Sequence, residues 1–265
     1  MLSAALVAGL AFQMAQNPSP MTEQARSHDR IVQKASNSRR AGRALTIGHP
    51  GPASPVILHF HGDAWLPEQS VAAAFAHATV IAIHLGTGSG VCQDAFNPPE
   101  AFQSLLAEAN AGSANRPVIL SAFSAGYGAV RAILGHSYSR IDSVLLLDGL
   151  HTDYAGKDID PAGMDVFPRF ARDASISRKR MLLTHSEVFP GTFSSTTETT
   201  DWLLDQLKLR RLPVLRWGPG GMQQLSEARR GRLRILGFAG NSAPDHVDLH
   251  AGQGLGCQGK VEMSC

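Results

Sequence analysis

A serine between small residues is the most specific chemical feature of this chain. Ser124 stands in the pentapeptide Ala122-Phe123-Ser124-Ala125-Gly126, at the end of an apolar run and directly before a helical pattern. A serine hydroxyl can attack an acyl carbonyl when a neighbouring base takes its proton. The same pattern also suits a serine that caps a helix, which is frequent wherever a strand leads into a helix.

The run, the turn and the helix around this serine resemble the nucleophile elbow of the α/β-hydrolase family. The resemblance implies a turn so tight that only small residues fit two positions either side of the serine, a need that Ala122 and Gly126 meet. Ala122 departs from the commoner glycine but preserves the small size. The resemblance covers roughly residues 44–250 and implies a cofactor-free serine hydrolase with Ser124 as its nucleophile.

A His-Gly pair follows the first apolar run of the core. His61 and Gly62 lead into Asp63 and Ala64. In the resembled family, a loop at this place donates one backbone amide to the oxyanion hole, and the residue after the serine donates the other. The resemblance therefore implies an oxyanion hole formed by the amides of Asp63 or Ala64 and of Ala125, which requires no particular side chain.

Two histidines compete for the role of general base. His246 and His250 both follow the last apolar run, and the family order of serine, acid and histidine places the histidine there. His246 lies nearer to the end of the run and follows a turn that contains Pro244. We therefore expect His246 to be the base, with His250 as the alternative.

The acid that would orient the histidine is either Asp148 or Glu187. A carboxylate is needed to hold the imidazole in one tautomer and to stabilise the imidazolium. Asp148 ends an all-apolar run, where an unpaired carboxylate would be costly. Glu187 ends the next run, which is where the resembled family more commonly keeps its acid. We expect Asp148 and keep Glu187 as the alternative.

Two other hypotheses remain open. His59, His61 and Asp63 also resemble the start of the metal site in the metallo-β-lactamase superfamily, in which alternate histidines hold one cation. That family expects a further histidine where Ala64 stands, so a metallohydrolase is the weaker hypothesis and we expect no bound metal. The other hypothesis is an α/β-hydrolase scaffold that acts as a non-catalytic binding protein.

The elements that must position these residues are short apolar runs that alternate with helical patterns. The runs lie at 55–60, 79–85, 116–123, 143–148, 180–186 and 232–240, and the clearest helical patterns at 98–110 and 125–134. Ser195 and Glu198 predict a capping box at the start of a further helix. Continuous apolar runs of this length are typical of strands buried on both faces.

The alternation predicts a doubly wound α/β fold with a mostly parallel sheet and helices on both faces. The family resemblance implies about eight strands. Between the fourth and fifth runs there are only about thirty residues, too few for an extensive helical cap. We therefore expect a minimal cap and an open site that prefers short-chain esters.

Composition argues against a charge-driven partner. The chain has 265 residues, with 24 Lys and Arg against 22 Asp and Glu, a net charge of +2. A charge so near zero does not favour nucleic acid or an anionic membrane. We expect one catalytic domain at 44–265 that acts on a small-molecule ester, with no nucleic-acid partner, no cofactor and no stable membrane insertion.

The N-terminal residues favour export. The apolar run at 2–12 is too short to cross a bilayer, and a polar stretch with prolines follows it, as after a cleaved signal peptide. The lack of Lys and Arg before Arg26 argues against a signal. We expect a signal peptide at 1–15, a mobile arm at 16–43, and a secreted or periplasmic protein; without a signal the protein would be cytoplasmic.

The cysteines neither build a disulfide framework nor show a paired zinc-binding spacing. In an exported protein, Cys257 and Cys265 can close a small loop. We expect Cys92 to be buried.

Overall fold

The computed structural model describes residues 45–47, 53–62, 71, 78–112, 116–218, 222–247 and 249. The expected signal peptide and arm lie outside these residues, as do Cys257 and Cys265. No helix within the described ranges is long and apolar enough to span a membrane.

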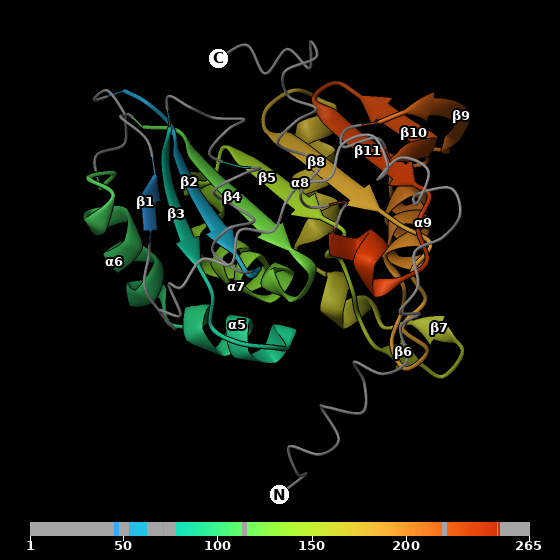
Figure 1. The fold of residues 1–265 in the computed structure, drawn as a ribbon. Coiled ribbons are helices and arrows are strands. Elements are labelled where there is room, and N and C mark those ends of the chain that lie inside the picture. The colour runs from blue at the N-terminus through green and yellow to red at the C-terminus, as the bar shows by residue number, and fades with distance from the viewer. Residues whose placement is uncertain are drawn as a thin grey trace, which may run out of the picture.

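A nine-stranded sheet forms the centre of the described part of the chain, in the order β1-β3-β2-β4-β5-β8-β11-β10-β9 (Figure 1). The six central strands are mutually parallel. They are β2 (Val56–Phe60), β3 (Thr79–Ile83), β4 (Val118–Phe123), β5 (Ser143–Leu147), β8 (Arg180–His185) and β11 (Leu233–Phe238). Each corresponds to one predicted apolar run, so the mostly parallel sheet is confirmed.

The strands that the sequence did not reveal are antiparallel and lie at the edges. β1 (Leu45–Ile47) pairs with β3, while β10 (Gln223–Arg230) and β9 (Leu212–Trp217) extend the sheet beyond β11. β10 alternates buried and half-buried residues up to its exposed end, and β9 is mostly exposed. β10 has no continuous apolar run of the kind that marks a strand buried on both faces, and the apolar residues of β9 are interrupted by Pro213.

Five described helices pack on one face of the sheet, and the helical residue Val71 packs on the other face. The described helices are α5 (Ser89–Phe96), α6 (Pro99–Glu108), α7 (Tyr127–Ser137), α8 (Phe167–Ser175) and α9 (Thr196–Gln206). They share one core cluster with every second residue of the strands, such as Leu58, whereas Ile57 packs on the opposite face with the helical residue Val71. Side chains alternate between the faces of a strand, so the predicted doubly wound architecture is confirmed.

The helix predictions have mixed outcomes. α6, α7 and α9 were anticipated, and Ser195 and Glu198 form the predicted capping box at the start of α9. Helix α5 had not been anticipated, and its mixed sequence with a glycine near the start explains why. Cys92 is buried in α5, as expected.

The segment between β5 and β8 contains no lid of helices. Residues 149–179, all described, form a small hairpin of β6 (Tyr154–Ala155) and β7 (Asp158–Ile159), a 3-10 turn and α8. Helix α8 buries Phe167 and Phe170 in the main core cluster. It therefore covers the sheet instead of standing above the strand ends.

The order of the central strands fixes where a ligand is expected. The chain passes from β2 outward to β3 and then returns across β2 to β4, so the direction of winding changes between β2 and β4. In doubly wound sheets, ligands bind beyond the carboxyl ends of the strands at such a switch point. Ser124 follows β4 and His61 follows β2, which places both at this point.

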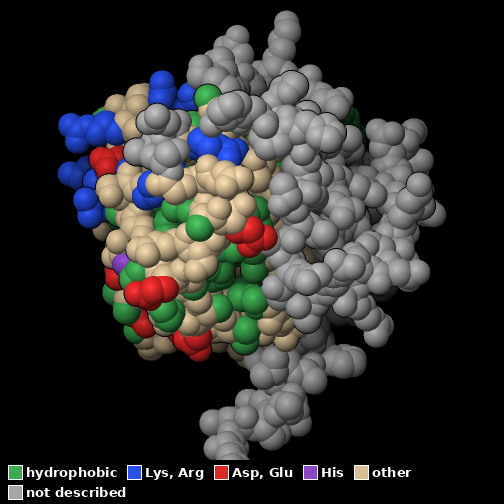
Figure 2. All heavy atoms as spheres, turned by 90° about the vertical axis from the view of Figure 1, so that its left-hand side faces the viewer, with side chains coloured by type: hydrophobic (Ala, Val, Ile, Leu, Met, Phe, Trp, Pro, Cys, Tyr) green, Lys and Arg blue, Asp and Glu red, His purple; other side chains and the backbone are tan. Residues whose placement is uncertain are grey.

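The molecular surface carries both signs of charge. On the face shown in Figure 2, Lys and Arg side chains gather towards the top, while most Asp and Glu side chains lie in the lower half. On this face, the two signs of charge therefore lie in separate areas.

Two buried histidines lead to a prediction about stability in acid. Burial lowers the pKa of His59 to about 3 and that of His185 to about 4. In the unfolded chain both titrate near pH 6.5, so between pH 6.5 and 4 the unfolded state binds more protons and stability falls as the pH falls. We expect the free energy of unfolding in urea to be about 2 to 4 kcal/mol lower at pH 5 than at pH 7. Equal values at the two pH values would contradict this.

Candidate active site

Ser124 lies on a sharp turn between β4 and α7. Its φ is 46°, a left-handed conformation that is uncommon for a residue with a side chain, and the residues Ser124–Gly126 form a 3-10 turn. A Cβ added to Gly126 would lie 2.1 Å from the carbonyl oxygen of Phe60, and Ala122 is fully buried. The turn therefore leaves no room for a side chain at Gly126, while Ala122 is buried before it.

The loops after β5 and β11 reach the same turn. A Cβ on Gly149 would lie 2.6 Å from the carbonyl oxygen of Ser124, so the loop after β5 packs directly against the serine backbone. The ring of Phe123 lies 4.5 Å from the ring of His246, measured between centroids. The structure thus brings together the backbone of Ser124, the Asp148-Gly149 loop and the side chain of His246.

Asp148 is a buried carboxylate whose oxygens are fully engaged. Its Oδ2 atom accepts hydrogen bonds from His246 Nδ1 at 2.6 Å and from the Ser186 hydroxyl at 2.6 Å. Its Oδ1 atom accepts from the Ser186 amide at 2.9 Å and from the Thr196 hydroxyl at 2.6 Å. The side chain of Asp148 is 1% exposed, so these four hydrogen bonds take the place of the bonds to water that an exposed carboxylate would make.

The charge of Asp148 is held by these donors. Burial raises the pKa of the carboxyl, but the neighbouring His246 and the hydrogen bonds from Ser186 and Thr196 outweigh burial and lower the pKa to about 2. Asp148 is therefore ionised at neutral pH. A carboxylate facing Nδ1 fixes the proton of a neutral imidazole on that nitrogen and leaves the Nε2 lone pair available as a base.

The turn that carries His246 is itself capped. The Ser242 hydroxyl accepts from the Asp245 amide at 3.2 Å, and the Asp245 carboxylate accepts from the Ser242 amide at 3.1 Å. This reciprocal pair is a capping box for the short helix at 243–247. The spacing Ser-x-x-Asp is the sequence signature of this helix start.

Ser124 and His246 are not hydrogen-bonded to each other. Among the described residues, no hydrogen bond joins the Ser124 hydroxyl to the His246 ring; the contact between the two segments runs through Phe123. Hydrogen bonds of this kind are often long before substrate binds and tighten in the reacting complex.

A buried histidine braces the loop after β2. His59 Nε2 donates to the His61 carbonyl oxygen at 3.0 Å, so its Nδ1 atom accepts from the Ser121 hydroxyl at 2.9 Å. The next residues have left-handed backbones, with φ of 70° at His61 and 100° at Gly62. His59 thus holds the start of the loop that was expected to supply an oxyanion amide.

The structure places the other predicted residues as follows. Ala125 is half-buried in the turn after Ser124, whereas Asp63, Ala64 and His250 lie outside the described residues. Glu187 is exposed, and its backbone amide donates to the Gly240 carbonyl oxygen. The carboxylate that contacts His246 is that of Asp148.

The hydrogen bonds of His59 argue against its role as a metal ligand. Both ring nitrogens of this histidine are engaged in hydrogen bonds within the chain. No cluster of three His, Cys, Asp or Glu side chains that could hold a metal is found among the described residues, which do not include Asp63.

Sequence reasoning missed the residues that support Asp148. Ser186 and Thr196 come from the end of β8 and the first turn of α9, and both are buried. A serine and a threonine are common at strand ends and helix starts, so their types alone carry no signal. Their role follows only from the pairing of β5 with β8, which sets the two strand ends side by side.

A scan of protein-family models and a search of curated proteins find no match. Similar solved structures include a carboxylesterase of Bacillus subtilis, at 8% identity over 88% of this chain and 91% of that chain, with a TM-score of 0.45. A thermostable esterase is similar at 12% identity over 82% of this chain and 60% of that chain, with a TM-score of 0.43. A structure from work on two metagenome-derived lipolytic enzymes shows 12% identity over 56% and 77%, with a TM-score of 0.34. Because these values are low, the chemistry has to be judged from the residues of this chain.

The close contact at Gly126 gives a prediction. Gly126→Ala should shift the backbone at Ser124, because the new Cβ would overlap the Phe60 carbonyl oxygen. We expect a loss of stability of about 1 to 3 kcal/mol, measured by urea unfolding. Gly135→Ala in the same region is the matched control: a Cβ there meets nothing within 4 Å, and it should be neutral or stabilise by up to about 1 kcal/mol. Equal effects of the two substitutions would contradict the tight turn.

Proposed function

We propose that the protein is a serine hydrolase that cleaves carboxylic esters or thioesters through an acyl-enzyme. In this proposal Ser124 is the nucleophile, His246 the general base and acid, and Asp148 the residue that orients His246. The observation that carries it is the buried hydrogen bond between Asp148 Oδ2 and His246 Nδ1, next to the strained turn of Ser124. Such an arrangement is costly to build and has a clear use in acyl transfer.

The mechanism divides hydrolysis into two steps. The Ser124 hydroxyl oxygen attacks the acyl carbonyl while its proton passes to His246 Nε2, and the imidazolium then protonates the departing alcohol or thiol. A water molecule next gives its proton to the same nitrogen and attacks the acyl-enzyme, and the proton returns to the Ser124 oxygen as the acid leaves. Throughout, the Asp148 carboxylate remains ionised and stabilises the imidazolium.

The negative charge on the carbonyl oxygen would be held by backbone amides. We propose the amide of Ala125 and one from the loop after Gly62, with Asp63 and Ala64 as the candidates. His61 and Gly62, at the start of that loop, have left-handed backbones, and the side chain of His59 donates a hydrogen bond to the His61 carbonyl oxygen. This conformation fits a loop whose amides must point at the carbonyl oxygen of the substrate. Each such donor is worth about 3 kcal/mol in a site that excludes water.

The role of Ser124 is tested by its removal. Ser124→Ala should abolish labelling by a fluorophosphonate probe and turnover of p-nitrophenyl acetate, because no other hydroxyl occupies the turn after β4. Ser139→Ala, at an exposed position, is the control and should retain both activities. Circular dichroism should be unchanged in both variants. Full labelling and turnover in Ser124→Ala would refute the proposal.

The choice of acid is tested by a pair of amide substitutions. Asp148→Asn should lower kcat on the order of a thousandfold, because an amide facing Nδ1 favours the wrong imidazole tautomer. Glu187→Gln should lower kcat much less, since its side chain is exposed. Steady-state kinetics with p-nitrophenyl acetate measures both. If Glu187→Gln lowered kcat more than Asp148→Asn, the catalytic acid would instead be Glu187, in the loop after β8.

A further inference from the structure

Positive charge is concentrated in the last strands of the sheet. A third of the lysines and arginines of the chain lie in residues 208–234, which contain a single acidic residue, Glu227. This range covers β9, β10 and the start of β11. The net charge of the whole chain is only +2, so the residues outside this range are net negative. A partner meets the local charge of a surface, which here differs strongly from the charge of the whole chain.

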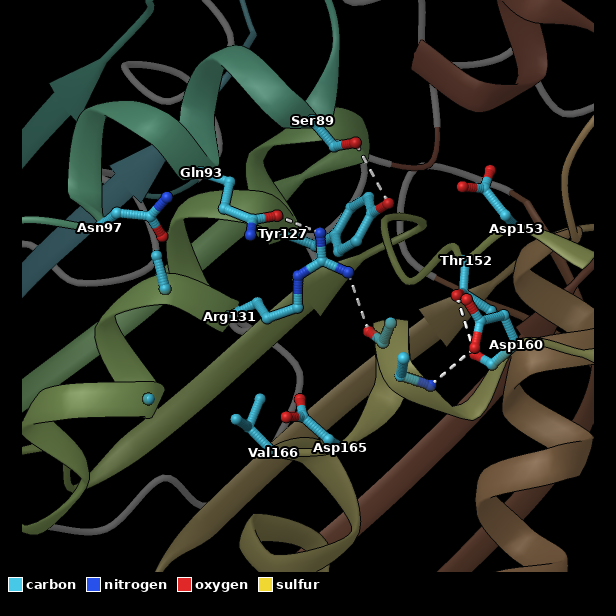
Figure 3. Close-up of a pocket in the computed structure, with 14 residues that line it drawn as sticks. Ser89, Gln93, Asn97, Tyr127, Arg131, Thr152, Asp153, Asp160, Asp165 and Val166 are labelled. Carbon is cyan, nitrogen blue, oxygen red and sulfur yellow. Dashed lines mark hydrogen bonds between the residues drawn. The ribbon is translucent and has the colours of Figure 1, made fainter.

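Some of the balancing acidic residues lie at the opposite end of the molecule. Asp153, Asp160 and Asp165 line a polar cavity of about 500 Å³ between α5, α7 and the loop at 152–166 (Figure 3). The hairpin β6–β7 of this loop lies at the lower end of the molecule in Figure 1, whereas β9 and β10 lie at the upper end. The two signs of charge are therefore separated along the molecule.

Three arginines of the last strands lie around Glu227. Arg216 Nη2 donates to one carboxylate oxygen of Glu227, and Arg229 Nε lies 3.5 Å from the other. Arg229 is also directly opposite Arg234 in the pairing of β10 with β11, and like charges in this position repel. Glu227 thus carries one negative charge against three positive charges. Because the side chains of Arg216 and Arg229 are more than half exposed, an anion from outside can reach them.

The arginines lie on the face of the sheet that is turned away from the main core. Ala228 stands between Glu227 and Arg229 on β10, and Ile235 follows Arg234 on β11. Ala228 and Ile235 both belong to the main core cluster. Side chains alternate between the faces of a strand, so Glu227, Arg229 and Arg234 point to the other face.

The edge strand β9 adds exposed apolar side chains to this surface. Leu212, Leu215 and Trp217 are each more than half exposed. Leu212 is directly opposite Glu227 and therefore lies on the face of the arginines. Among the described strands, β9 pairs with β10 alone, so these side chains lie at the outer edge of the sheet. Tryptophan beside basic residues is typical of a surface that meets the boundary between lipid headgroups and hydrocarbon.

Other partners fit this surface less well. A second copy of the chain would bring like charges together. An added β-strand would have to pair with the edge of β9, where Pro213 has no N–H group to donate. A nucleic acid would pair with the arginines, but its phosphates would gain nothing from the exposed Leu212 and Leu215.

We propose that this surface docks the protein on an anionic phospholipid bilayer. The docking surface is formed by Arg216, Arg229 and Arg234 together with Leu212, Leu215 and Trp217. The guanidinium groups pair with the lipid phosphates, and the three apolar side chains enter the headgroup layer. The contact is peripheral and is independent of the proposed hydrolase activity, because none of the proposed catalytic residues belongs to the docking surface.

The test is sedimentation of the full chain with sucrose-loaded vesicles. We expect binding to phosphatidylcholine vesicles that contain about one third phosphatidylglycerol to be about tenfold or more tighter than binding to pure phosphatidylcholine, and to weaken at high salt. Arg229→Gln combined with Trp217→Ser should lower the affinity for the anionic vesicles about tenfold or more. The matched control combines Lys157→Gln with Val91→Ser, which also removes one exposed cation and one exposed apolar side chain, and should retain the affinity. Circular dichroism should be unchanged in both double variants.

The outcomes that would overturn the docking surface are distinct. Absence of binding to the anionic vesicles, or equal binding to both kinds of vesicle, would contradict it. Unchanged binding after Arg229→Gln with Trp217→Ser, or an equal loss in the control, would assign the binding to another part of the chain. Tighter binding to a DNA duplex than to the anionic vesicles at the same salt concentration would point instead to a nucleic acid. None of these outcomes depends on catalysis at Ser124.

Discussion

The buried charge of Asp148 is the constraint on which the rest of the site depends. A carboxylate that is 1% exposed is stable only if its oxygens are met by donors, and here the donors come from three separate segments. Ser186 directly follows β8, Thr196 begins α9, and His246 lies in the short helix after β11. Removing one donor would leave part of a buried charge unpaired, so the three segments are tied to one another by electrostatics.

The parallel sheet explains how distant residues meet at this carboxylate. β5, β8 and β11 are neighbours, and their carboxyl ends lie along one edge of the sheet. Asp148, Ser186 and the turn to His246 each follow one of these strands. On the other side of β5, β4 ends in the turn of Ser124, and β2 ends in the loop that His59 braces. The direction of winding reverses between β2 and β4, and in doubly wound sheets ligands bind at such a point.

The sequence predicts the parallel strands and the main site residues because both have local signals. An apolar run of six residues is recognisable by itself, and so is a serine between small residues at its end. For the acid, the sequence favours Asp148 but leaves Glu187 as an alternative, because the choice depends on which strand end faces His246. The strands β9 and β10 escaped prediction because β9 is mostly exposed and contains Pro213, whereas β10 has no continuous apolar run. Ser186 and Thr196 escaped because Asp148, their partner, lies far away in sequence.

The acyl-enzyme is the central claim, and its direct detection is the most decisive measurement. The protein should be mixed with p-nitrophenyl acetate, quenched in acid within milliseconds and analysed by mass spectrometry, intact and after digestion. We expect one added acetyl group, located on the peptide that contains Ser124, and its loss when the quench is delayed beyond substrate exhaustion. An acetyl group on another residue, or turnover of the ester without any acetylated protein at any quench time, would contradict the account.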